Sequence, residues 1–76
     1  MWIRHNGIMI NLDKCYKIRI DKADFSENPC IRFIHGFGQY FLISTEIEYP
    51  DTATAERWFD ELHKAIKADV PIFDMR

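Results

Sequence analysis

Cysteine, glycine and proline are scarce in this chain. Its 76 residues include only two cysteines, three glycines and three prolines. Two cysteines, Cys15 and Cys30, are too few for a disulfide framework and lack the spacing of a metal site, so we expect both to be reduced and structural. The low glycine and proline content, together with a hydrophobic fraction of 47%, predicts a packed globule rather than a disordered segment.

The sequence also lacks a charge surplus and a long apolar run. The formal net charge is −2 at pH 7, so no strong overall field draws the chain to nucleic acid or to an anionic membrane. No run reaches the roughly 18 apolar residues of a membrane span, and the N-terminal segment lacks the apolar core of a signal peptide. These absences predict one cytoplasmic domain over residues 1–76, with no membrane as a partner.

Catalytic signatures are missing as well. The sequence has no pattern typical of zinc proteases, redox dithiols, serine hydrolases or phosphate-binding loops. A cysteine nucleophile needs a neighbouring base and a lowered pKa, and the sequence supplies neither to Cys15 nor to Cys30. We therefore assign no catalytic, cofactor-binding or metal-binding residue, expect no cofactor and no small-molecule substrate, and predict that the protein is not an enzyme.

An Asn-Gly pair near the N-terminus predicts a β-hairpin. Asn6 and Gly7 separate two mainly apolar stretches, residues 2–5 and 8–11. Both residue types tolerate the positive φ of a type I′ turn, which joins two strands through two residues. The alternation then places Ile3, Ile8 and Ile10 on one face of the hairpin and Trp2, Arg4 and Met9 on the other.

An alternating segment and two further apolar segments predict a β-meander. Polar and apolar residues alternate over residues 15–21, which is typical of a strand with one buried face. A loop over residues 22–29 leads to strands over residues 30–35 and 39–45, joined by a three-residue turn at residues 36–38. An extension of the last strand to Tyr49 stays open.

Burial sets the register of these strands, because a slip of one residue moves every side chain to the opposite face. Pairing apolar residues puts Ile18 beside Phe33 and Ile20 beside Ile31. The pairs expected across the turn are His35 with Gln39, Phe33 with Phe41, and Ile31 with Ile43. Cys15 and Cys30 then lie at opposite ends of the hairpin, too far apart for a disulfide at about 3.3 Å per residue.

The reverse face of the meander is less polar than a solvated sheet face should be. It carries Ile34, Tyr40 and Leu42 together with Lys17, Arg19 and Arg32. Apolar groups framed by basic ones suggest a contact surface, which a second copy of the chain would cover most simply. Two alternatives stay open. The apolar residues are scattered exposed side chains, or Arg19, Arg32 and Tyr40 bind single-stranded nucleic acid.

Residues 52–67 carry the strongest helical pattern in the sequence. Apolar residues recur there at three- and four-residue steps: Ala55, Trp58, Phe59, Leu62, Ala65 and Ile66. Asp51 or Thr52 is the expected N-cap, and Pro71 lies beyond the end of the helix. The tail, residues 68–76, is apolar around Ile72 and Phe73, so we expect it to pack on its own domain or on a partner.

Two family resemblances come from these segments. AERWFDELHKAIK, preceded by a β-meander, is similar to the closing helix of pleckstrin-homology domains, with Trp58 in the place of their tryptophan. INLD at residues 10–13, followed by strands and this helix, resembles small bacterial or phage-borne proteins built from a short hairpin, strands and a C-terminal helix. The first resemblance implies antiparallel strands closed by a helix. The second implies the fold alone, because that family carries no assigned activity.

These patterns predict an α+β fold: a curved antiparallel β-meander of four to five strands within residues 2–49, with one amphipathic helix over residues 52–67 on one face. The expected contact brings Trp58, Phe59, Leu62 and Ile66 against Ile18, Ile20, Phe33, Phe41 and Ile43. The expected function is a non-enzymatic protein-interaction module, a homodimer that uses Arg32, Ile34, Tyr40 and Leu42 or the tail residues Ile72 and Phe73.

Overall fold

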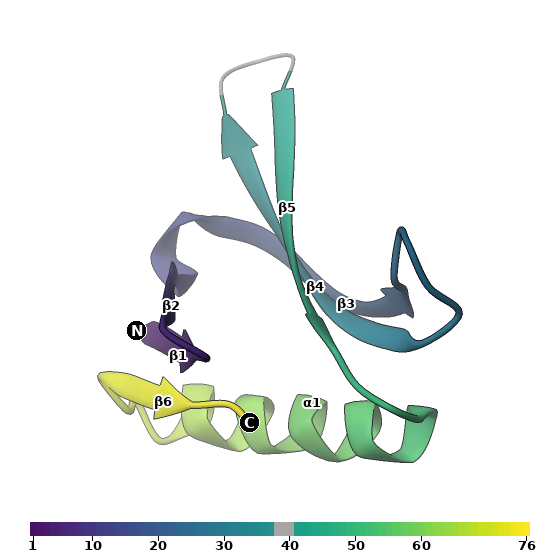
Figure 1. Ribbon diagram of the computed structural model, residues 1–76. Helices are drawn as coiled ribbons and strands as arrows, with labels where there is room; N and C mark the ends of the chain where they lie inside the picture. The colour runs from purple at the N-terminus through teal and green to yellow at the C-terminus, as the bar shows by residue number, and fades with distance from the viewer. Residues whose placement is uncertain (38–40) are drawn as a thin grey trace.

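The computed structural model describes the backbone of residues 1–37 and 41–76 and the side chains outside residues 37–42. The described chain forms six strands, a short 3-10 helix and one α-helix (Figure 1). In chain order these are β1 (Trp2–His5), β2 (Ile8–Asn11), η1 (Leu12–Lys14), β3 (Cys15–Lys22), β4 (Pro29–Phe37), β5 (Phe41–Glu48), α1 (Thr52–Lys67) and β6 (Ile72–Asp74). The predicted α+β class, with a C-terminal helix packed on antiparallel strands, is confirmed.

The strands form two sheets of three strands each. Sheet A has the order β2-β1-β6, and sheet B has the order β3-β4-β5. The turn between β1 and β2 has positive φ at Asn6 (46°) and Gly7 (77°), so the predicted hairpin is confirmed. Strand β6 lies parallel to β1, with Ile72 beside Trp2 and Asp74 beside Arg4. The tail therefore packs on its own domain, which the sequence left open.

Sheet B confirms one predicted register and corrects the other. Ile18 faces Phe33 and Ile20 faces Ile31, as expected between β3 and β4. Between β4 and β5, His35 faces Ile43, Phe33 faces Thr45 and Ile31 faces Ile47. The three pairs predicted across the turn at residues 36–38 are therefore wrong, because the strands pair as far as Phe37 with Phe41. Ile47 therefore lies beside Ile31 and is buried, whereas Ile43 lies on the same face of β5 but beside His35, nearer the turn, and is exposed.

Helix α1 begins and ends at the predicted residues. Asp51 is the N-cap, and its carboxylate accepts hydrogen bonds from the backbone N–H (2.7 Å) and the hydroxyl (2.8 Å) of Thr54. These bonds favour the charged carboxylate and lower the pKa of Asp51. The helix packs on β3 and β4 and buries Ala55, Leu62 and Ala65, whereas Ile66 stays half-exposed.

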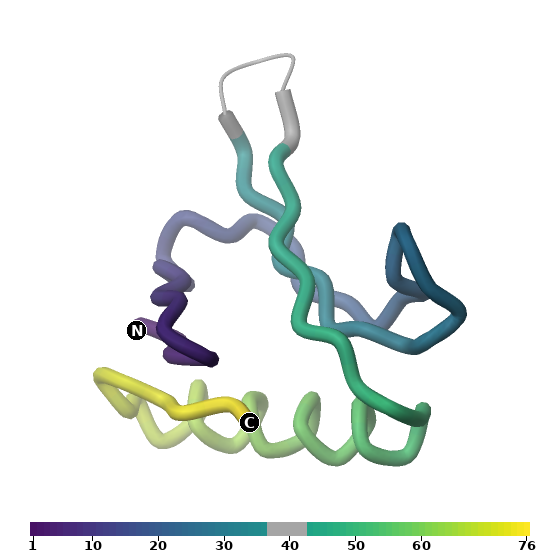
Figure 2. The backbone as a smooth tube through the Cα atoms, in the orientation of Figure 1, coloured from purple at the N-terminus to yellow at the C-terminus, as the bar shows by residue number. Residues whose placement is uncertain are grey.

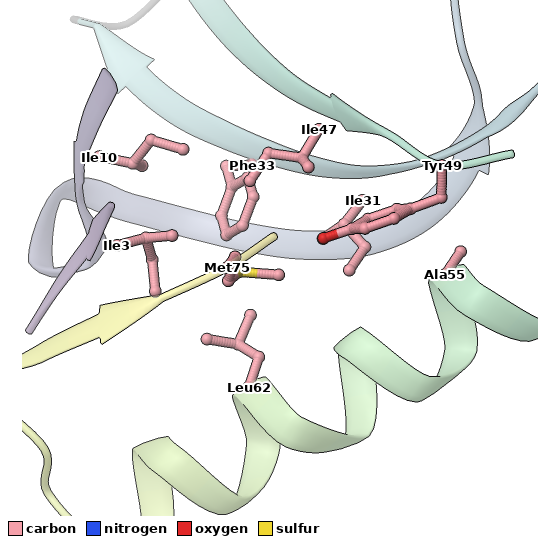
Figure 3. Close-up of a cluster of buried hydrophobic side chains, with 9 residues drawn as sticks. All are labelled: Ile3, Ile10, Ile31, Phe33, Ile47, Tyr49, Ala55, Leu62 and Met75. Carbon is pink, nitrogen blue, oxygen red and sulfur yellow. The ribbon is translucent and has the colours of Figure 1, made fainter. Parts of the chain in front are cut away.

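The core gathers side chains from both sheets, the helix and the C-terminal strand region (Figure 3). Its buried members are Ile3, Ile10, Ile31, Phe33, Ile47, Tyr49, Ala55, Leu62 and Met75. Half-buried residues such as Trp58, Phe59, Ile18 and Ile20 pack around them. The predicted helix–sheet contact thus holds for Leu62 and Phe33. It is wrong for Ile43, which the register shift leaves exposed, while Phe41 has no described side chain.

The two ends of the molecule expose different elements. Sheet A and β6 lie at one end of α1, and the loop between β3 and β4 projects at the other end (Figure 1). After α1 the chain turns back along the helix, so that β6 lies beside the N-terminal hairpin (Figure 2).

Candidate interaction surfaces

The outer face of sheet B, where we expected a contact surface, carries charged side chains that pair within the chain around Arg32. Arg32 in the central strand β4 is only 7% exposed. Its guanidinium donates to the carboxylates of Asp21 (3.3 Å), Asp24 (3.3 Å) and Glu46 (3.1 Å) and to the carbonyl oxygen of Lys22 (2.8 Å). A buried cation needs partners for its donors, and neighbouring segments of the same chain supply them here.

Strand register explains why these groups meet. Arg32 faces Arg19 on β3 and Glu46 on β5, so a positive, a positive and a negative side chain lie in one row. Asp21 relieves the repulsion between the two arginines, because its Oδ2 lies 3.1 Å from Nη2 of Arg19 and 3.3 Å from Nε of Arg32. Asp24 reaches the same guanidinium from the loop after β3. The row is therefore paired within the chain.

That pairing weakens support for nucleic-acid binding. Phosphate recognition needs accessible cationic groups. Arg32 is enclosed by carboxylates and Arg19 is paired with Asp21. Tyr40, the aromatic group of that hypothesis, lies outside the described residues. Arg32 is thus unavailable to a phosphate, whereas Arg19 stays half-exposed, and this alternative stays a prediction.

The remaining predicted site residues divide between buried and exposed positions. Ile34 is buried on the outer face of sheet B. Leu42 pairs with Gly36 through its backbone, but its side chain lies outside the described ones. In the tail, Phe73 is half-buried and its ring lies 6.4 Å from that of Trp58, whereas Ile72 is exposed. Of the predicted apolar residues with described side chains, Ile72 is the one available to a partner.

Sequence reasoning missed the surface that Ile72 belongs to. The outer face of sheet A consists of Trp2 and Arg4 from β1, Met9 from β2, and Ile72 and Asp74 from β6. Trp2, Met9 and Ile72 are 42%, 46% and 47% exposed. Beside them Arg4 makes a two-bond ion pair with Asp74, at 2.5 and 3.0 Å, which lowers the pKa of Asp74. The hairpin pattern had placed Trp2, Arg4 and Met9 together, but only the β6 pairing completes the face.

A cysteine and a histidine also meet in the fold. The sulfur of Cys15 lies 3.6 Å from Nδ1 and 3.8 Å from Nε2 of His35, its cross-strand neighbour. Partial burial nevertheless raises the pKa of the Cys15 thiol, which disfavours the reactive thiolate. Burial also raises the pKa of Cys30, to about 11. A raised pKa makes either thiol a poor nucleophile, and both cysteines are free of disulfide bonds.

Within the described part of the chain, no group of three or more histidine, cysteine or acidic side chains is arranged to hold a metal ion. Among the same residues, no helix has the length and apolar character needed to cross a membrane. Comparisons with protein-family models, curated proteins and solved structures find no match to this chain.

Proposed function

We propose that the chain is a non-enzymatic protein-interaction module that forms a homodimer through the outer face of sheet A. The observation that carries this proposal is the exposure of Trp2, Met9 and Ile72 on three adjacent strands. Aromatic residues, methionine and arginine are enriched at protein interfaces, and buried tryptophans there often dominate the binding energy. This face combines all three residue types with Ile72 at its edge.

A second copy of the chain suits this face because its charges are self-complementary. In a two-fold dimer the same face meets itself, so each Arg4 can approach the Asp74 of the other copy. Arg4 and Asp74 already neutralise one another within one chain, so pairing two copies buries no net charge. Two sheets stacked in this way lie about 10 Å apart, a spacing that apolar side chains fill.

The test compares Met9→Glu with wild type by light scattering on a size-exclusion column. The wild type is expected at twice the mass of one chain, and Met9→Glu as a folded monomer whose dimer dissociation constant is raised at least tenfold. The new carboxylate faces Arg4 across the hairpin, so the monomer should tolerate it. Circular dichroism checks the fold of the variant.

Ile43→Glu is the matched control. Ile43 is an exposed apolar strand residue like Met9, but it belongs to sheet B. It should therefore leave the dimer unchanged. A dimer that survives Met9→Glu, or that dissociates equally with Ile43→Glu, would contradict the sheet A proposal.

A further inference from the structure

The loop between β3 and β4 holds a fully exposed aromatic side chain in a fixed frame. Phe25 is 99% exposed. The loop around it is closed by a hydrogen bond from the backbone N–H of Ala23 to the carbonyl of Asn28, at 2.9 Å. Because the Phe25 ring is exposed, it contributes no apolar burial to the stability of its own fold. An ordered loop that presents such a ring is typical of a contact with another molecule.

Strand β5 fixes that loop from one side. The carboxylate of Glu48 accepts hydrogen bonds from the Ser26 hydroxyl and from the Asn28 side-chain amide, the latter at 2.9 Å. Glu46 accepts one from the backbone N–H of Asp24, at 3.1 Å. These bonds hold the residues on both sides of Phe25. A pre-ordered loop loses less conformational entropy on binding than a mobile one.

A small apolar hollow lies elsewhere on the same chain, between α1 and β3. Ile18, Phe59, Leu62, His63 and Ile66 line it, and its volume is about 110 Å³. Ile66 at its rim is half-exposed, so the hollow opens to solvent. For scale, a closed cavity of about 150 Å³ with similar lining binds benzene. The hollow is thus of the right order to receive one phenyl ring.

We infer that Phe25 of one copy inserts into the Ile18–Phe59–Ile66 hollow of a second copy. Both size and charge favour the Phe25 loop of a second copy as the occupant of this hollow. The loop of Phe25 carries Asp24 and Glu27, which pair with Arg32 and Lys22 of their own chain but stay exposed. The hollow includes His63, with Lys67 one turn further along α1. Glu56 and Asp60 lie on the preceding turns of α1, so the acidic loop is expected over the C-terminal half of the helix.

This contact is different in kind from a sheet A dimer. Phe25 and the hollow are distinct sites on one chain, so the contact is head-to-tail and can repeat from copy to copy. The loop lies at the opposite end of α1 from sheet A (Figure 1). The inference therefore stands without the sheet A dimer, and both contacts together would build assemblies larger than two chains.

The test uses the Met9→Glu protein, in which the sheet A contact is disabled, and sedimentation velocity over a concentration series. Met9→Glu is expected to be monomeric at the low concentrations of the light-scattering test and to associate as the concentration rises above them. Adding Phe25→Ser removes the inserted ring, and adding Ile66→Arg blocks the hollow while preserving helix propensity. Each should weaken the association at least tenfold. An equimolar mixture of the two should form a one-to-one complex, because one chain keeps its ring and the other its hollow.

Ile43→Ser in the same background is the control for loss of an exposed apolar side chain, and should change nothing. His63→Trp, which also fills the hollow, replaces Ile66→Arg if circular dichroism shows that the latter unfolds. A Met9→Glu protein that stays monomeric, or a mixture that forms no complex, would overturn the inference. If Phe25→Ser abolishes association while Met9→Glu leaves wild-type association intact, the sheet A proposal fails and this one stands.

Discussion

The central strand of each sheet carries one arginine on its outer face, and the two arginines have opposite surroundings. Arg32 in β4 is buried and donates to Asp21, Asp24 and Glu46. Arg4 in β1 is exposed and pairs with Asp74, beside apolar side chains that remain in solvent. The same residue type at equivalent positions is thus buried among carboxylates in one sheet and exposed beside apolar side chains in the other.

The difference comes from what the neighbouring segments bring. The loop after β3 folds back over sheet B, where Asp24 and the carbonyl of Lys22 reach Arg32. Sheet A has short edge strands, and its outer face receives the single carboxylate Asp74 from β6. An arginine among apolar residues therefore does not by itself mark a binding surface. The carboxylates that reach it decide whether the face is satisfied within the chain.

Arg32→Ala is expected to give the largest effect. It removes the cation that three carboxylates share, which leaves Asp21, Asp24 and Glu46 close together without a positive partner. Breaking a buried ion pair typically costs 3–5 kcal/mol. The carboxylates here stay partly hydrated, so we expect a loss of about 3 kcal/mol, measured by urea unfolding. That is a large share of the stability of a small domain.

Arg4→Ala is the matched control for this comparison. It removes an arginine at the equivalent position of sheet A, where both side chains of the ion pair are more than half exposed. Exposed ion pairs contribute little to stability. The variant should therefore unfold close to the wild-type urea concentration. Equal losses for the two arginine variants would show that the surroundings described here do not distinguish them.

The elements set by local sequence could be predicted. The Asn6-Gly7 turn follows from backbone conformation, and the helix over residues 52–67 follows from its periodicity and the Asp51 cap. The pairing of Ile18 with Phe33 also followed from matching apolar residues. Each of these depends on residues near in sequence or on a strong alternation.

The elements that depend on residues far apart in the sequence could not be predicted. The β4–β5 register is displaced by four residues from the predicted one, and an even displacement keeps every side chain on its face, so alternation cannot detect it. The pairing of β6 with β1 joins the two ends of the chain through three residues. The enclosure of Arg32 could not be predicted for the same reason, because its partners come from β3, the following loop and β5.

Tyr49 differs from Arg32 in that its polar group is buried without a partner among the described residues. Its hydroxyl is buried and has no hydrogen-bond partner among the described residues, and burial raises its pKa to about 12. Leaving a buried polar group unsatisfied is destabilising. Tyr49→Phe should therefore raise the free energy of unfolding by about 1 kcal/mol at pH 7, measured by urea unfolding.

The pH dependence of the same variant gives an independent check. An unfolded tyrosine ionises near pH 10, whereas the folded one resists ionisation up to about pH 12. The wild type should lose stability as the pH rises between these values, and Tyr49→Phe should lose less. A variant less stable than wild type at pH 7 would indicate that the hydroxyl does have a partner.

The smallest expected effect is that of changing Glu48, whose carboxylate holds the loop between β3 and β4 in place. Hydrogen bonds from Ser26 and Asn28 favour its charged form and lower its pKa. A lowered folded-state pKa means that the carboxylate supports the loop above the ordinary glutamate pKa of about 4.3 and loses this role as the pH falls through the lower folded value. The backbone amide NMR signals of Ser26 and Asn28 should therefore shift under acidic conditions. In Glu48→Gln the amide oxygen still accepts both bonds but does not titrate, so those shifts should vanish. If they persist in the variant, another carboxylate controls the loop, and Glu46, which accepts from the backbone of Asp24, would be the group to change next.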